Sequence, residues 1–510
     1  MMLLKLPALL WIILVALTSA HDGEPAPAAD CAIAATLLGA IFFQLTSFYF
    51  LNHRDPDMRK YSYEVFTSMI SIFCAVLLFT SINDFAGHLV LKGTSLQVAL
   101  LIAMLQLIPW FGIMHLVLAY FSGSFGGKAR DMKETETNIK CCVSLLAHTT
   151  GFAAIHAVGN VQQLPMFSDS PLRSFLVIPF AIYGLKVLQL SFATMHDFVR
   201  CSNAEAEDVY KEASSEAEND VTGLVLSFMV TQSIRYSISG ILPNLEGEEE
   251  GHEGSIHSVD QVVMLLTTGL VFMLARAYLA YRNQGDESGE GHMAPEDSWM
   301  SLCTALSMTF AWCTFFSAEW SFGSISVLRS HVMLQMLSLA LAMSGLSLVC
   351  VRLLDLFADA EHRSHRRVEL AVRNVISCFG ILTGFAWEKC FDEALVSLSS
   401  QFENRAGVKL CLGLISLSAI IPAWRHYLVP MLIHEGWRYG FVIKGKDHLD
   451  ELVKQHTEVE KKKEEKNNSK KRRHDDIREN GDEKQSKKSK TQDTETLRHR
   501  GISSTGGVLN

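Results

Sequence analysis

Six residues that could carry or bind charge lie inside long apolar stretches of the sequence. They are Thr231, Arg235, Lys186, His156, Glu319 and Glu388. A charged side chain in the hydrocarbon of a bilayer is costly, and it usually faces a helix-bundle interior or a water-filled cavity. These six side chains are therefore candidates for a substrate or ion pathway. The cationic members would suit a small anionic or proton-coupled substrate.

The stretch Val221–Pro243 is long and apolar enough to cross a membrane, yet it contains Arg235. Ser227, Thr231, Arg235 and Ser239 recur at every fourth position of this stretch. Residues four apart lie on one face of a helix, so the spacing predicts a polar stripe down one side. We expect Arg235, and Lys186 in the middle of another stretch, to face a cavity or a partner rather than lipid.

Glu319 and Glu388 lie near predicted outer helix ends, and Lys389 follows Glu388 directly. The C-terminal end of a helix carries partial negative charge, which suits a cation and disfavours a carboxylate. The two glutamates therefore need partners, and Arg235 or Lys389 could supply one. Three interpretations stay open for such residues: they line a pathway, they form ion pairs that fix helix packing, or they reach the membrane interface.

Eleven apolar stretches predict an all-α, polytopic bundle of membrane-spanning helices, because lipid-exposed backbone must satisfy its own hydrogen bonds. The stretches lie at about 31–51, 63–87, 96–120, 141–162, 174–195, 221–242, 260–281, 299–320, 330–351, 372–391 and 407–429. With the N-terminus outside, the inner loops would carry fifteen Lys and Arg residues and the outer loops four. This bias predicts an outside or luminal N-terminus and a cytosolic C-terminus.

The two ends of the chain differ from the bundle, which we place at residues 31–432. Residues 1–20 have one Lys, an apolar run and a small-residue end, which is typical of a cleaved signal peptide. Residues 444–510 are rich in both charges and predict a largely disordered cytosolic tail. The chain is thus expected in a membrane of the secretory pathway, either the plasma membrane or an endomembrane.

Two loops and one internal similarity complete the pattern. His196–Asp220 predicts a solvated cytosolic helix, and Asn244–Asp260 predicts a solvated acidic loop that could hold a divalent cation weakly. The motif Thr-Gly-Phe-Ala occurs at residues 150–153 and again at 383–386. Because the two copies fall in spans four and ten, they predict a parallel internal repeat of helices 2–5 as helices 8–11.

The sequence lacks the motifs of several enzyme and pump classes. It has no Walker loop, GxGxxG fingerprint, HExxH or GxSxG, and its cysteines show no metal-ligand spacing. We expect no catalytic residues, metal, cofactor or nucleic-acid partner; the bilayer is the expected partner. The leading hypothesis is a secondary transporter or ion pathway, and the alternative is a non-transporting scaffold, receptor or assembly protein. A membrane enzyme is the third, less favoured class.

Overall fold

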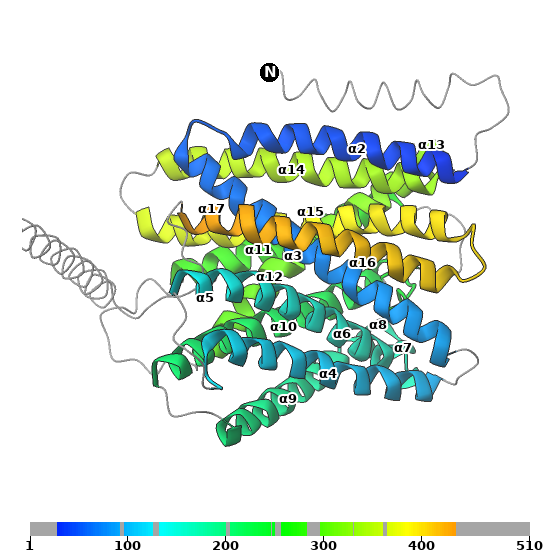
Figure 1. Ribbon diagram of the computed structural model, residues 1–510. Coiled ribbons are helices and arrows are strands. Elements are labelled where there is room, and N and C mark those ends of the chain that lie inside the picture. The colour runs from blue at the N-terminus through cyan, green and yellow to red at the C-terminus, as the bar shows by residue number, and fades with distance from the viewer. Residues whose placement is uncertain are drawn as a thin grey trace, which may run out of the picture. The chain divides into compact units, whose positions relative to one another are not determined.

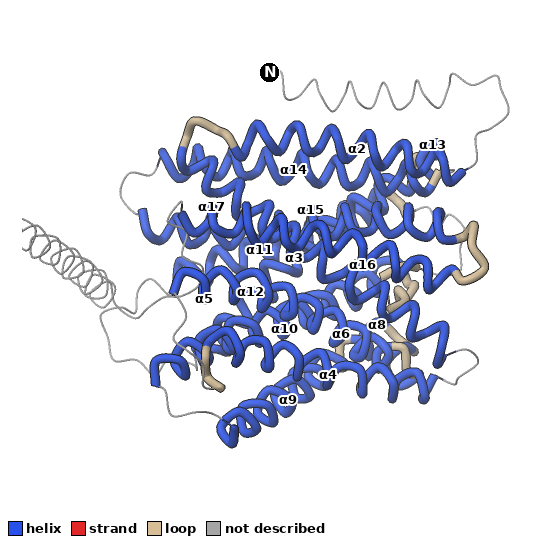
Figure 2. Tube along the Cα trace, viewed as in Figure 1, coloured by secondary structure: helices blue, strands red, loops and turns tan. Residues whose placement is uncertain are grey.

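The computed structural model describes residues 28–434, except for residues 92–95, 126–131, 200–203, 246, 250–256, 283–295, 330 and 361–364. The chain divides into two units, Met1–Arg438 and Tyr439–Asn510, and every described residue belongs to the first. The predicted signal peptide and charged tail lie outside the described residues. The described part contains helices and loops and no strand (Figure 2), which confirms the all-α prediction.

A long helix occupies each of the eleven predicted spans (Figure 1). These helices are α2 (Ala28–Leu51), α3 (Pro56–Ala86), α4 (Leu96–Ser122), α6 (Ser144–Gln162), α9 (Val177–Val199), α10 (Ala204–Ser239), α11 (Val259–Arg282), α12 (Glu296–Gly323), α14 (Val332–Ala360), α15 (His365–Ser399) and α16 (Arg405–Ala423). Short helices join or extend them: α5 (Met132–Asn138), α7 (Pro165–Ser168), α8 (Pro171–Ser174), α13 (Ser326–Arg329) and α17 (Val429–His434). Three π-helical segments lie at Gly87–Leu91, Ile139–Val143 and Trp424–Leu428.

Eight helical segments of the described residues are long and apolar enough to cross a membrane. They include α3, α4, α6, α9, α11, α12, α14 and α16. The chain is therefore an integral membrane protein by the length and composition of its helices. That α2, α10 and α15 also cross the membrane stays a prediction.

Five of the long helices form a closed inner ring. Helix α3 packs on α6, α6 on α10, α10 on α12, α12 on α15, and α15 returns to α3. The other six long helices lie outside this ring: α4 packs on α6, α9 on α10, α11 on α12, α14 on α15, α16 on α3, and α2 on α14 and α15. Inner and outer helices alternate along the chain, so the five inner helices all run in one direction.

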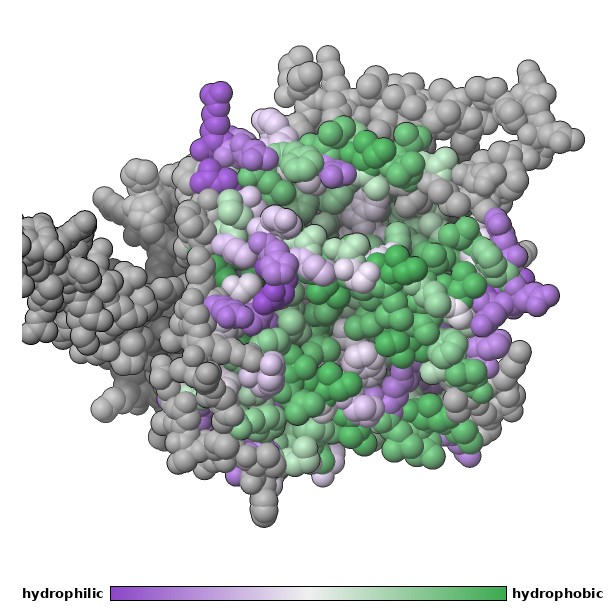
Figure 3. Space-filling model, viewed as in Figure 1, coloured by the Kyte–Doolittle hydropathy of each residue, from purple (hydrophilic) through white to green (hydrophobic). Residues whose placement is uncertain are grey.

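Burial separates the two layers. In their most apolar windows, α6 and α12 have 78% of their residues buried, whereas α11 has 11% and α16, with its extension, 17%. Figure 3 shows apolar residues over the middle of the visible face and hydrophilic residues mainly toward its left and right edges, where the helices end. This surface suits contact with lipid.

The inner ring is filled by aromatic side chains from four of its helices, which we call the aromatic core. Its members are Phe152, Phe228, Trp312, Phe315, Phe316 and Phe385, and all are buried. The Trp312 and Phe385 rings meet edge to face with centroids 4.7 Å apart, and Phe228 meets Trp312 in the same way at 5.2 Å. Edge-to-face packing brings the positive ring edge to the negative face of the next ring.

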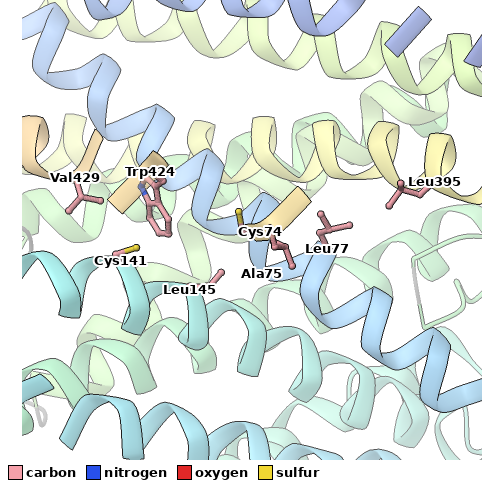
Figure 4. Close-up of a cluster of buried hydrophobic side chains, with 9 residues drawn as sticks. Cys74, Ala75, Leu77, Cys141, Leu145, Leu395, Trp424 and Val429 are labelled. Atoms are coloured by element: carbon pink, nitrogen blue, oxygen red, sulfur yellow. The ribbon is translucent and has the colours of Figure 1, made fainter. Parts of the chain in front are cut away.

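Glycine allows α15 to approach α3 closely, as the Gly380-x-x-x-Gly384 ridge predicts. A Cβ atom at Gly384 would lie 2.5 Å from the carbonyl oxygen of Met69, and one at Gly380 would lie 2.6 Å from Ser68 Cβ. On the opposite side of α3, a buried cluster attaches α16 and α17 to the ring (Figure 4). In this cluster Trp424 and Val429 pack near Cys74 of α3 and Cys141.

One loop prediction was wrong. The segment predicted as a solvated helix, residues 196–220, is helical where it is described, but its residues 204–220 form the first half of α10, which runs unbroken from Ala204 to Ser239 and is partly buried. Ala206, Tyr210, Ala213 and Ala217 are buried because they form one stripe at helical spacing that packs on the bundle. The charged residues between them mask this stripe in the sequence.

The packing agrees with the predicted internal repeat. Phe152 and Phe385, from the two copies of the Thr-Gly-Phe-Ala motif, stack on each other with centroids 6.3 Å apart and planes 2° apart. Thr150 donates to Trp110 O of outer helix α4, and Thr383 shares a hydrogen bond with Ser347 of outer helix α14. Outer helices α9 and α16 also pack on α10 and α3, the ring helices next to α6 and α15.

Candidate functional site

Arg235 lies near the C-terminal end of α10, and its guanidinium group is buried with its side chain 2% exposed. The polar stripe predicted on α10 faces the protein, since Ser227 and Thr231 are fully buried. Thr231 donates its hydroxyl hydrogen to Ser227 O at 2.8 Å, so its own hydroxyl is satisfied within the helix. The stripe prediction is therefore confirmed for its orientation.

The loop after α10 supplies the partners of Arg235. A turn held by hydrogen bonds between Asn244 and Glu248 places Gly247 at a φ of +84°, a conformation that favours glycine. Arg235 Nη1 donates to Gly247 O at 2.7 Å, and Nη2 donates to Glu249 Oε1 at 3.0 Å. Glu249 is thus buried, so the expectation of a solvated acidic loop is wrong for this residue, whereas Glu248 beside it is 56% exposed.

Aromatic rings of α12 enclose the same group. The Arg235 guanidinium carbon lies 3.8 Å from the centroid of the Phe316 ring and 5.6 Å from that of Trp320. His257 stacks on Trp320 at 4.0 Å and places its Nε2 3.2 Å from Glu249 Oε2. Arg235, Glu249, His257, Phe316 and Trp320 form what we call the Arg235 cluster. Ring faces attract a cation, so this surrounding stabilises the guanidinium charge.

Glu319 has a cationic partner, as a carboxylate near the C-terminal end of a helix needs. Lys389 Nζ of α15 donates to Glu319 Oε1 of α12 at 3.3 Å, and Glu248 Oε1 lies 4.0 Å from the same nitrogen. Glu319 also interacts electrostatically with Arg235. The structure therefore brings Arg235, Thr231 and Glu319 of the six candidates to one region where α10, α12 and α15 meet.

Glu388 belongs to a second group, because neighbouring residues on a helix diverge by about 100° around its axis. It faces α3 on the same side of α15 as Gly384 and Asp392. Lys409 of α16 donates to Asp84 Oδ2 of α3 at 2.6 Å and lies 2.8 Å from Asp392 Oδ1. We call Asp84, Glu388, Asp392 and Lys409 the acid–lysine cluster.

Glu388 differs from the other members of this cluster. Its side chain is 2% exposed, and no described residue donates a hydrogen bond to its Oε1. It interacts electrostatically with Asp392, Lys409, Lys389 and Asp84. Two carboxylates, those of Asp84 and Asp392, thus contact the Lys409 ammonium group, and the more deeply buried Glu388 has an oxygen without a donor among the described residues.

The remaining two candidates lie apart from these groups. His156 of α6 packs edge-on against Phe79 with centroids 5.9 Å apart, and it interacts electrostatically with Asp84. Lys186 is exposed on outer helix α9, so the expectation that it faces a cavity or a partner was wrong. A helix on the outside of the ring can point a long cationic side chain along the membrane toward its surface.

Sequence reasoning missed four members of the two clusters: Glu249, His257, Asp392 and Lys409. Lys409 had a usable signal, because it lies inside the apolar run of span eleven. Among the described residues, no group of three or more His, Cys, Asp or Glu side chains is arranged as a metal site. Comparisons with protein-family models, with curated proteins and with solved structures found no match.

Proposed function

We propose that this chain is a proton-coupled secondary transporter of a small anionic solute, and that the acid–lysine cluster is its proton site. The observation that carries the proposal is the buried Glu388 Oε1, to which no described residue donates a hydrogen bond. A carboxylate taken out of water without a donor loses its hydration and gains nothing in return. A proton delivered to Glu388 removes that cost.

The charge balance of the cluster supports the same step. Asp84, Glu388 and Asp392 carry three negative charges when ionised, and Lys409 carries one positive charge, so two negative charges are uncompensated within the cluster. Buried charges are normally paired. Uptake of one proton lowers the excess from two negative charges to one. Unlike a metal ion, a proton needs no set of coordinating ligands.

Exposure decreases stepwise through the cluster, which offers protons a route from water. The side chains of Asp84 and Asp392 are 34% and 26% exposed, and Lys409 is 9% exposed. Glu388 lies beyond them. Intramembrane carboxylates in such a series are typical of proton relays in transporters.

The anion would bind at the cations of the neighbouring group. Arg235 and Lys389 already hold the carboxylates of Glu249 and Glu319 in their places. In our proposal a substrate carboxylate or phosphate replaces one of these internal partners. Because Lys389 and Glu388 are consecutive on α15, protonation of one site and occupation of the other act on the same helix.

A second function, a non-transporting scaffold, is favoured by one specific observation. Arg235 donates to three acceptors, Gln232 Oε1, Gly247 O and the Glu249 carboxylate, and lies near two aromatic rings, with its side chain 2% exposed. Such a dry, paired charge can fix how helices pack without taking part in transport. The transporter and the scaffold differ in whether Glu388 takes up and releases a proton. They do not differ in the buried, paired state of Arg235.

The test uses full-length protein in liposomes that contain a pH-sensitive dye, with lactate, glutamate, phosphate or sulfate added outside. We expect at least one anion to drive proton entry, Glu388→Gln to abolish it, and Glu403→Gln, at an exposed loop residue, to leave it unchanged. A pH-difference infrared spectrum provides a readout that needs no substrate, since Glu388→Gln should remove one carboxylic-acid band. If Glu388→Gln removes no carboxylic-acid band, the scaffold function is favoured.

A further inference from the structure

A cavity of about 260 Å³ lies between α4, α9 and the first half of α10, apart from both charged clusters. It is lined by Gly112, His115, Leu116, Phe125, Phe192, Met195, His196 and Tyr210. Two histidines and three aromatic rings in one wall invite an interpretation as a polar or metal-binding site. The contacts of these rings do not support a polar or metal-binding site.

The polar atoms of the wall are occupied by one another. His115 Nδ1 shares a hydrogen bond with the Tyr210 hydroxyl at 2.9 Å, and His115 Nε2 lies 3.4 Å from Glu218 Oε1. His196 Nε2 and Ser124 Oγ are 2.6 Å apart. His115 Nε2 makes no hydrogen bond to a described residue, but the other ring edges named here are engaged, so most polar groups of the wall do not require a ligand.

The wall of the cavity is largely apolar, and its aromatic rings stack in pairs. The His196 ring stacks on Tyr210 with centroids 3.6 Å apart and planes 7° apart. The His115 ring stacks on Phe192 at 5.4 Å with planes 13° apart. Stacked rings held by hydrogen bonds at their edges make a rigid, largely apolar wall, which is typical of sites for apolar ligands.

The rim of the cavity opens onto the lipid-facing surface. Leu116 and Met195 are 58% and 59% exposed, and Phe125 is 38% exposed. These side chains continue the exposed apolar faces of α4 and α9, which include Tyr120 and Leu190. The rim residues also lie within about two helical turns of the ends of α4 and α9, where an acyl chain leaves its headgroup.

We propose that this cavity binds one acyl chain of a bilayer phospholipid, which enters sideways between α4 and α9. The largely apolar wall accepts methylene groups, and Met195 at the rim can adapt to a flexible chain. This site is independent of the proposed transport function. It would attach outer helix α9 to the bundle through lipid as well as through its contacts with α10.

The experiment uses full-length protein in phosphatidylcholine nanodiscs that contain a small fraction of phosphatidylcholine with a diazirine in its acyl chain. After irradiation, mass spectrometry maps the labelled residues. We expect labelling at Leu116 and Met195 to exceed that at Val271, which is 62% exposed on outer helix α11. Equal labelling at all three positions would overturn the proposal.

Two glycines supply a matched pair of variants. A Cβ atom at Gly112 would meet only ordinary contacts, with Phe192 at 3.5 Å, so Gly112→Leu can fill the cavity without displacing backbone. Gly184 on α9 has nothing within 4 Å, and Gly184→Leu is the control. Gly112→Leu should reduce cavity labelling about tenfold, as expected when roughly two methylenes lose their burial. Gly184→Leu should leave it unchanged.

A second variant and a second probe keep the proposal falsifiable if Gly112→Leu does not fold. Met195→Trp narrows the mouth and should also reduce labelling, with no change at Val271. A diazirine-bearing sterol at the same mole fraction tests another occupant. If the sterol labels the cavity and the phospholipid does not, the acyl-chain assignment is wrong.

Discussion

Two arginine–carboxylate pairs of this protein have nearly equal geometry and opposite surroundings. Arg235 and Glu249 are 3.0 Å apart with side chains 2% and 5% exposed, whereas Arg173 and Asp169 are 2.9 Å apart and 56% and 57% exposed. We predict that truncating the buried arginine destabilises the protein and truncating the exposed one does not. Arg235→Met keeps the apolar stem of the side chain and removes the charge.

The magnitude follows from what Arg235→Met leaves behind. Among the described residues, His257 is then the one ion-pair partner left to the buried Glu249 carboxylate, and breaking a buried pair from one side costs about 3–5 kcal/mol. Loss of the contact with the Phe316 ring is included in this figure. For Arg173→Met we expect less than about 1 kcal/mol, because solvent screens an exposed pair and its ordering entropy offsets the attraction.

The double variant Arg235→Met with Glu249→Gln separates the pair from the rest of the site. It removes the buried charge that the single variant leaves unpaired, so we expect a coupling energy of about 2–3 kcal/mol between the two changes. The matched cycle at Arg173 and Asp169 should give a coupling below about 0.5 kcal/mol.

Unfolding by SDS in mixed micelles measures these differences, with a fluorogenic maleimide as the reporter. Cys313 and Cys390 are not in disulfide bonds and are fully buried, so they should react only after the bundle opens, while exposed Cys411 sets the baseline. Similar losses of unfolding free energy at both arginines, or a coupling near zero at the buried pair, would refute the reasoning from burial.

Three further predictions follow from the fold, the acid–lysine cluster and the charge bias. Gly384→Ala should cost about 1–3 kcal/mol, because its Cβ would lie 2.5 Å from Met69 O, whereas Gly345→Ala, with nothing within 4 Å, should be neutral or slightly stabilising; SDS unfolding compares them. Lys409→Met should cost about 3 kcal/mol or more in the same assay, because it leaves the acid–lysine cluster without its cation; a neutral effect would mean that the carboxyls are already protonated. The sequence Asn467-Asn468-Ser469 in the charged tail matches a glycosylation acceptor. A glycosylation acceptor inserted between α10 and α11 should be modified in microsomes while Asn467 is not, and the opposite pattern would reverse the predicted orientation.

The helices could be predicted because a membrane span has a strong and local signal. Each of the eleven apolar stretches became a helix, since about 20 apolar residues are enough to specify one in lipid. Burial was harder to predict, as α11 and α12 are both apolar but only α12 faces the ring. Hydropathy measures affinity for lipid and for protein interior alike. Lys186 shows the consequence, because its place in the middle of a span did not reveal that α9 is an outer helix.

The partners of Arg235 could not be predicted for a different reason. Glu249 lies in a segment whose composition is typical of a solvated loop. Its burial depends on Gly247, whose positive φ turns the chain back over α10, and on the affinity of a guanidinium group for a carboxylate. A buried charge near a helix end attracts an opposite charge from the nearest loop, and the sequence separation of only fourteen residues was the available signal.

The predicted repeat, if it relates the two halves of the ring, would make these charged groups equivalent in pairs. Asp84 of α3 corresponds to Glu319 of α12, and His156 of α6 corresponds to Lys389 of α15, each about one repeat length away. In both halves an acid on one ring helix therefore interacts with a base on its ring neighbour, since Glu319 bonds to Lys389 and Asp84 interacts with His156. The two halves differ because Asp84, in the Asp84–His156 pair, forms its ion pair with Lys409. His156 instead packs against Phe79, and Glu388 interacts with the acidic groups of Asp84 and Asp392. In our proposal, this difference between the two halves accounts for the candidate proton site.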